Sequence, residues 1–283
     1  MRGESRLGLA YALSAVLFFS TSPIFVRWAA PLSTYQVACG RLVVGSAAIL
    51  LLAALRRELV WPGRRALGRF ALYGLITAVH FACYVAALNF TTIAHALTIV
   101  YTAPIFIAVL SAWLLREPLL ARRYLGILVA IAGLAVLVGF EPNLTPRMLL
   151  GDLLALGSAI TFALYSIAGR SQRQSYPLFT YAGLVYGMAA LWLAPLALTL
   201  APQTPAWPQL AAVIGLGLVP MAAGHTLYNA ALRHTHAAYA NLIATQEVTG
   251  GVLLGVLLLG ELPGPSAIAG LVVALSGIAL VLL

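Results

Sequence analysis

Charged residues are scarce in this chain of 283 residues. Asp, Glu, Lys and Arg together make up only 8% of it, 62% is hydrophobic, and the mean hydropathy is +0.99. Soluble globular domains carry about 25% charged residues, which cover the surface that they expose to water. A soluble fold is therefore excluded by composition, and the apolar residues are expected to meet lipid.

Lysine is absent, and cysteine occurs only at Cys39 and Cys83. Both cysteines lie inside apolar stretches, which fits neither a disulfide framework nor the spacing of metal ligands. The sequence also lacks a P-loop, a His-Glu-x-x-His motif, paired aspartates within apolar stretches and a Gly-x-Ser-x-Gly motif. We therefore predict that the protein is not an enzyme and that it has no metal site and no cofactor.

Long apolar runs, by contrast, fill the chain, and ten of them reach the roughly 20 residues that a membrane-spanning helix needs. Their expected limits are 7–28, 34–55, 67–88, 94–114, 121–140, 149–169, 178–200, 209–231, 237–259 and 263–283. The first run exceeds the roughly 7–15 apolar residues of a signal-peptide core, so we interpret it as a retained span. The sequence predicts an all-α integral membrane protein with ten transmembrane helices.

Arginine supplies all 16 basic residues and a formal charge of +9. The arginines lie in the connections rather than on one amphipathic face, so we expect them to set topology and expect no nucleic-acid partner. With the N-terminus inside, the cytoplasmic side receives Arg2, Arg6, Arg56, Arg57, Arg64, Arg65, Arg69, Arg116, Arg122, Arg123, Arg170, Arg173 and Arg233. The outer side receives only Arg27 and Arg147, and both termini are expected to be cytoplasmic.

The two halves of the chain repeat each other. The segment Tyr84-Val-Ala-Ala-Leu88 returns as Tyr228-Asn-Ala-Ala-Leu232, an offset of 144. The same offset relates Thr91 to Thr235, Glu117 to Glu261, Gly126 to Gly270 and Gly133 to Gly277, and an offset of 143 relates Arg27 to Arg170. Five spans are an odd number, so the second half enters the membrane upside down. We predict one membrane domain built as 5+5, a first repeat at 1–140 and an inverted repeat at 141–283, an architecture typical of transporters.

A family resemblance rests on the ends of these repeats. Glu117 and Glu261 end equivalent spans, and similar tails follow them, Tyr124-Leu-Gly-Ile-Leu-Val-Ala-Ile-Ala-Gly133 and Ile268-Ala-Gly-Leu-Val-Val-Ala-Leu-Ser-Gly277. With Arg41 in the second span, this pattern resembles the EamA-type branch of the drug/metabolite transporter superfamily over essentially the whole chain. Glu247-Val248 matches a Glu-Pro-Val motif of that family without its proline. The resemblance implies a carrier in the bacterial inner membrane, most similar to exporters of aromatic and other neutral amino acids.

Polar side chains form stripes on six of the expected spans, which make three symmetry pairs: first with sixth, third with eighth, fourth with ninth. Polar groups in hydrocarbon are costly and usually face the interior of the bundle, so these stripes are expected to line a central cavity. The predicted substrate-binding residues are His80, Tyr84, Tyr101, Tyr165, His225, Tyr228, Asn229, Tyr239, Gln246 and Glu247. For the tyrosines, the alternative is an anchor at the headgroup level.

Glu247 is the only acid deep within an expected span. It could bind a substrate amine, exchange a proton, or hold two helices together through Arg41. Histidine can change charge near neutral pH, so His80 and His225 could couple transport to protons. Pro23 and Pro104 are expected to kink their helices and could serve as hinges for gating.

Transport of a small molecule by alternating access is the function that these observations favour. The expected substrates are aromatic or neutral amino acids and related metabolites, with the lipid bilayer as the other partner. The alternative is a multidrug or other metabolite exporter on the same scaffold. A channel or a purely structural membrane protein is a further alternative, which conductance in a planar bilayer would reveal or exclude.

Overall fold

The computed structural model describes residues 3–138, 145–172, 174–200, 202–259 and 266–282, and within these ranges it contains helices and connections without any strand. The first half contains α1 (Gly3–Phe19), α2 (Ser22–Trp28), α3 (Thr34–Leu55), α4 (Arg64–Phe90), α5 (Ile93–Val100), α6 (Ala103–Leu114) and α7 (Ala121–Val138). The second half contains α8 (Pro146–Ser171), α9 (Leu178–Thr199), α10 (Trp207–Leu216), the π-helix η1 (Gly217–His225), α11 (Thr226–His234), α12 (Ala237–Ala244), α13 (Glu247–Leu259) and α14 (Ser266–Leu282).

Seven helical runs are long and apolar enough to cross a membrane. They are Arg6–Trp28, Thr34–Leu55, Arg64–Phe90, His95–Leu114, Pro146–Ser171, Leu178–Thr199 and Trp207–His234. They coincide with seven of the expected spans, so the prediction of an all-helical chain with long apolar helices is confirmed. The expected spans at 121–140, 237–259 and 263–283 correspond to shorter or interrupted helices, and residues 139–144 and 260–265 lie outside the described residues. The total of ten crossings therefore stays a prediction.

Several of the expected spans are interrupted near their middle. Pro23 follows the break between α1 and α2, and Pro104 follows the break between α5 and α6, where the first turn of a helix tolerates proline. Threonine hydroxyls donate hydrogen bonds to backbone carbonyls at these breaks. The Thr21 hydroxyl donates to a carbonyl oxygen of the preceding turn at 2.7 Å, and the Thr102 hydroxyl does the same at 2.8 Å. Such bonds are needed because lipid offers no partner to a free carbonyl. Whether the two prolines gate transport stays a prediction.

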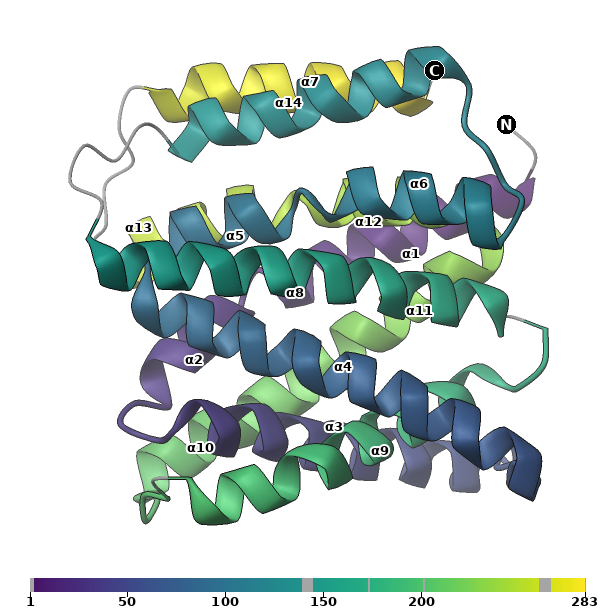
Figure 1. The fold of residues 1–283 in the computed structure, drawn as a ribbon, viewed down its shortest axis with the longest axis vertical. Coiled ribbons are helices and arrows are strands. Elements are labelled where there is room, and N and C mark those ends of the chain that lie inside the picture. Colours follow the sequence, from purple (N-terminus) through teal and green to yellow (C-terminus); the bar gives the residue numbers. More distant parts are fainter. Residues whose placement is uncertain (1–2, 139–144, 173, 201, 260–265, 283) are drawn as a thin grey trace.

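The helices run side by side across the molecule (Figure 1). Helices α7 and α14 pack together along one edge, and α3 packs on α9 near the opposite edge. Equivalent helices of the two halves make equivalent contacts: α4 packs on α8 as α11 packs on α1, and α5 packs on α8 as α12 packs on α1. A two-fold relation between the halves would produce these equivalent contacts, while the repeats expected at 1–140 and 141–283 stay a prediction.

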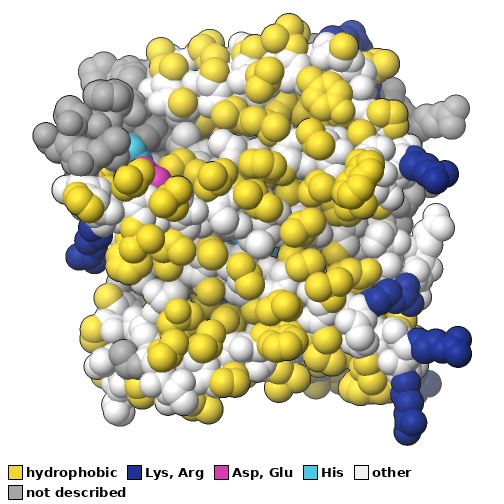
Figure 2. All heavy atoms as spheres, in the orientation of Figure 1, with side chains coloured by type: hydrophobic (Ala, Val, Ile, Leu, Met, Phe, Trp, Pro, Cys, Tyr) yellow, Lys and Arg dark blue, Asp and Glu magenta, His cyan; other side chains and the backbone are white. Residues whose placement is uncertain are grey.

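The exterior is apolar along the helices and basic at their ends. Figure 2 shows hydrophobic side chains over the middle of the molecule and arginines at its edges. Leu17, Leu55 and Trp113 are each more than 70% exposed, as expected of side chains that face lipid. Helices α1 and α14 have their outer ends on one side of the molecule, where most of the arginines visible in Figure 2 also project (Figures 1 and 2). We call this side the arginine-rich face.

Glycine allows α7 and α14 to cross in close contact. A Cβ atom at Gly133 would lie 2.2 Å from the backbone nitrogen of Ala274, and a Cβ atom at Gly277 would lie 2.2 Å from that of Ala130. The offset of 144 relates these two contacts, because Ala130 corresponds to Ala274 and Gly133 to Gly277. Small residues are the usual means of bringing membrane helices this close.

Replacing Gly133 with leucine should separate α7 from α14. The side chain would meet backbone atoms that cannot move aside, and overpacking of this kind costs at least about 1–3 kcal/mol. We expect Gly133→Leu to lower the thermal unfolding temperature of the purified protein by several degrees, measured by size-exclusion chromatography after heating. Gly68→Leu is the matched control, because a Cβ atom at that exposed position of α4 meets nothing within 4 Å. Equal effects of the two substitutions would contradict the close contact.

Candidate functional site

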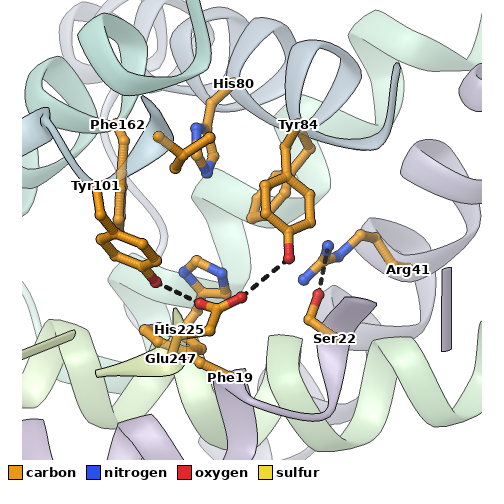
Figure 3. Close-up of a pocket in the computed structure, with 11 residues that line it drawn as sticks. Phe19, Ser22, Arg41, His80, Tyr84, Tyr101, Phe162, His225 and Glu247 are labelled. Atoms are coloured by element: carbon orange, nitrogen blue, oxygen red, sulfur yellow. Dashed lines mark hydrogen bonds between the residues drawn. The ribbon is translucent and has the colours of Figure 1, made fainter. Parts of the chain in front are cut away.

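A small enclosed cavity lies at the centre of the bundle (Figure 3). It is lined by Phe19, Ser22, Arg41, His80, Phe81, Tyr84, Val100, Tyr101, Phe162, His225 and Glu247, which come from both halves of the chain. Its volume is about 20 Å³. A cavity of this size holds about one water molecule. The protein is therefore closed around its centre in this conformation.

Glu247 is held in place from two sides. It is the first residue of α13, directly after the break in the expected ninth span, and the N-terminus of a helix favours a carboxylate. The hydroxyl of Tyr84 donates to Oε1 at 3.0 Å, and the hydroxyl of Tyr101 donates to Oε2. Tyr101 lies in the break between α5 and α6, so both repeats supply the contacts of this carboxylate.

Arg41 brings the opposite charge to the same cavity. It lies on α3 and is only 1% exposed. Its guanidinium carbon is 4.3 Å from the centre of the Phe81 ring, and Nη1 donates to the hydroxyl of Ser22 at 3.4 Å. Nε has no hydrogen-bond partner among the described residues. Arg41 and Glu247 are the only residues with charged side chains among the buried residues that the structure describes.

The direct ion pair between Arg41 and Glu247, which the sequence left open, is not formed. Within the described parts of the chain, no carboxylate oxygen lies within 4.0 Å of the Arg41 guanidinium. Tyr84 separates the two charges: its hydroxyl donates to Glu247, and its ring centre lies 5.9 Å from the guanidinium carbon of Arg41. A single tyrosine therefore links the two charged groups without neutralising either one.

The two histidines lie among aromatic rings. Nδ1 of His80 is 3.0 Å from both the carbonyl and the hydroxyl oxygen of Ser158, and its ring stacks on Phe162 with centres 4.8 Å apart. The His225 ring lies 4.5 Å from that of Phe19 and 5.0 Å from that of Phe81. Both imidazoles thus line the cavity predicted for them, while their proton-coupling role stays a prediction.

Three more of the predicted residues form a buried polar cluster next to the cavity. Asn229 donates to the hydroxyls of Tyr165 at 2.5 Å and Tyr186 at 3.3 Å, and to the carbonyl of His225 at 2.9 Å. The hydroxyl of Tyr228 lies 2.7 Å from that of Ser166 and accepts from the Asn241 amide at 3.1 Å. The cluster continues the polar centre towards the arginine-rich face, where α11 ends.

Tyr239 does not line the cavity, contrary to the prediction. It lies in the first turn of α12, where its hydroxyl accepts from Arg123 and its ring centre lies 5.1 Å from the Arg123 guanidinium carbon. The interrupted helix begins at Ala237, which leaves Tyr239 at the end of the span. This position matches the interfacial anchor that was the alternative for the tyrosines.

Gln246 is also outside the cavity, although it directly precedes Glu247. Its side chain donates to the hydroxyl of Thr245 at 3.4 Å and accepts from that of Thr249 at 3.2 Å. Gln246 lies in the break between α12 and α13, which the expected uninterrupted span did not include.

Ser22 belongs to the polar stripe expected on the first span and does line the cavity. Conversely, the sequence did not identify Phe19, Arg41 and Phe162 as lining residues, because the two phenylalanines are apolar and Arg41 was considered only as a partner of Glu247.

An ionic contact lies at the arginine-rich face. Arg170, at the end of α8, donates to both carboxylate oxygens of Glu117 at 3.1 and 3.2 Å and to the carbonyl of Leu232 at 2.9 Å. Nε2 of His236 lies 2.9 Å from the Glu117 carbonyl, and Nδ1 accepts from the Ala238 amide, an arrangement that suits a neutral imidazole. Burial lowers the pKa of His236 accordingly. These contacts join the connection after α6 to the ends of α8 and α11 and the start of α12.

The all-helical bundle, its apolar exterior and its charged, enclosed centre define a class of helical membrane transporters. The model of the EamA-like transporter family matches residues 6–139 and again residues 149–283. The chain belongs to this family, whose members are transporters, and the resemblance to the drug/metabolite transporter superfamily is confirmed.

Individual relatives are similar over nearly their whole length. The uncharacterized transporter YwfM of Bacillus subtilis (strain 168) is 27% identical over 281 residues, which cover 95% of this chain and 91% of that protein. An uncharacterized transporter of Archaeoglobus fulgidus is 29% identical over 269 residues, with 95% and 93% covered. A solved structure described as "Crystal structure of protein" superposes with a TM-score of 0.81 at 20% identity, covering 96% of this chain and 95% of that one. At that identity the likeness shows the fold alone.

Proposed function

We propose that this protein exports aromatic or neutral amino acids and related metabolites across the bacterial inner membrane, with the central cavity as its binding site. One observation carries the proposal: the two buried charged side chains of the described structure, Arg41 and Glu247, meet at one enclosed cavity between the repeats. Buried charges in a membrane are costly and mark the paths of substrates or ions.

The closed cavity requires a change of conformation during transport. A volume of about 20 Å³ admits a water molecule and no amino acid. The helices around it are interrupted between α1 and α2, between α5 and α6 and between α12 and α13. Interrupted helices beside a central site are typical of carriers in which inverted repeats rock about the substrate. Alternating access, with this conformation as a closed state, accounts for both features.

Aromatic rings support the choice of substrate. Phe19, Phe162, Tyr101 and His225 surround the cavity, and their rings can pack against a flat or apolar side chain. Ring faces can also attract an ammonium group. These features favour amino acids with aromatic or other neutral side chains.

The orientation follows from the arginines. The outer ends of α1 and α14 lie at the arginine-rich face, and positively charged connections remain in the cytoplasm. We therefore propose that this face is cytoplasmic. The contact between Glu117 and Arg170 then closes the cavity towards the cytoplasm.

Uptake into proteoliposomes tests the proposed function. We expect the purified protein to transport at least one aromatic or neutral amino acid saturably, when a labelled panel is assayed with and without a pH gradient. Protein-free liposomes and a panel of unrelated drugs are the controls. Transport of drugs with no amino acid would favour the multidrug alternative, and equal rates with and without the gradient would exclude obligate proton coupling.

A further inference from the structure

We propose that the central cavity recognises a zwitterion, with Arg41 binding a carboxylate and Glu247 binding an ammonium group of the same small molecule. The inference rests on the proposed transport function and adds the chemical group that each side chain binds. It concerns the two buried charges that the closed structure keeps apart.

The first argument is that Arg41 and Glu247 do not form an ion pair with each other. No carboxylate oxygen of the described residues lies within 4.0 Å of the Arg41 guanidinium, although Glu247 lines the same cavity. Nε of Arg41 has no hydrogen-bond partner in the part of the chain that the structure describes, and the 1% exposure of the residue excludes bulk water as a substitute. A buried donor without a partner is costly, and that cost falls when a ligand supplies an acceptor.

The second argument concerns the neutral groups that hold each charge. Glu247 accepts from two tyrosine hydroxyls, and Arg41 donates to the hydroxyl of Ser22. An ammonium group is a stronger donor to a carboxylate than a phenol, and a carboxylate is a stronger acceptor for a guanidinium than a serine hydroxyl. The hydroxyl groups thus hold both charged side chains in this conformation, and each is the partner that a substrate charge would replace.

The third argument is the balance of charge. Arg41 and Glu247 together give the centre one positive and one negative charge. A zwitterion preserves this balance, whereas a simple amine or carboxylic acid leaves one unpaired charge in a medium of low dielectric constant. The site should therefore reject molecules that carry only one of the two groups. Phe19, Phe162 and His225 remain to contact the rest of the substrate.

Three labelled probes of similar shape test the inference: phenylalanine, phenethylamine without the carboxylate, and 3-phenylpropanoate without the amine. We expect wild-type proteoliposomes to transport phenylalanine about 10- to 100-fold faster than either analogue, the ratio that one charged hydrogen bond supplies. In Arg41→Gln, phenylalanine transport should fall to the rate of phenethylamine. In Glu247→Gln it should fall to the rate of 3-phenylpropanoate. Arg41→Lys, which keeps the charge, should restore part of the preference over phenethylamine.

The variants must first elute as folded protein, and Asp152→Asn, a carboxylate paired with His95 away from the cavity, is the matched control. Wild-type transport of the analogues at the rate of phenylalanine would overturn the inference and leave the proposed transport function standing. An equal loss of all three probes in folded Arg41→Gln and Arg41→Lys would also overturn it, since Arg41 would then have a structural role. Failure of wild-type protein to transport any amino acid would instead contradict the proposed function, and the inference with it.

Discussion

Glu247→Gln is expected to reduce amino-acid transport about 100-fold while the protein remains folded. The glutamine keeps the size of the side chain and an oxygen that accepts from Tyr84 or Tyr101, so the packing at the start of α13 is preserved. The substitution removes the negative charge and leaves Arg41 as the only buried charge of the described structure. Loss of an interaction between a buried charge and its ligand costs about 2–3 kcal/mol, which corresponds to the expected factor.

The measurement is the initial rate of amino-acid uptake into proteoliposomes, normalised to the folded protein recovered by size-exclusion chromatography. Asp152→Asn serves as control, because it also neutralises a carboxylate within a helix but lies outside the cavity. A wild-type rate in folded Glu247→Gln would assign Glu247 to packing. If the variant instead lost only the response to a pH gradient, Glu247 would be a proton carrier.

Glu247 also shows which features of the candidate site could be predicted from the sequence. Its position deep within an apolar stretch can be seen in the sequence and marks it as important, because polar groups in lipid are costly. The spacing of His80 and Tyr84 can also be seen in the sequence, and helical periodicity places them on one face of α4. All three line the cavity. The helical fold could be predicted for the same reason, since apolar runs of about 20 residues have few alternatives in a bilayer.

The breaks within the helices could not be predicted in the same way. Tyr239 and Gln246 were assigned to the cavity on the assumption of a continuous ninth helix, whereas the structure interrupts it at Thr245 and Gln246, between α12 and α13. No proline marks this break, whereas Pro104 lies beside the break in the fourth span. The separation of Arg41 from Glu247 by Tyr84 depends on tertiary packing, which the sequence pattern does not specify.

The contact between Glu117 and Arg170 should set the balance between open and closed states of the arginine-rich face. Their side chains are 23% and 13% exposed, so the pair is partly screened, and removing one partner should cost about 1–2 kcal/mol. We expect Glu117→Gln to increase amide hydrogen exchange about 5- to 30-fold in residues 115–121 and 232–239, the factor that corresponds to this free energy. Asp152→Asn, which neutralises a carboxylate paired with His95 outside these segments, is the control and should leave these amides unchanged.

If the two halves are inverted relative to each other, as we predict, an equivalent contact at the opposite face should have the opposite effect on this exchange. Arg27 is the equivalent of Arg170 and lies on the exposed end of α2, away from the arginine-rich face, while its expected partner Glu261 lies outside the described residues. We assume that the pair of Glu117 and Arg170 closes the arginine-rich face and that the pair of Arg27 and Glu261 closes the other face. Arg27→Gln should then stabilise the state that is open to the other face, and amide hydrogen exchange at 115–121 and 232–239 should become slower. Loss of both pairs should then give rates near those of the wild type, since two shifts of opposite sign cancel. Faster exchange in all three variants would show that the pairs only stabilise the fold, because a change in overall stability has the same sign at both faces.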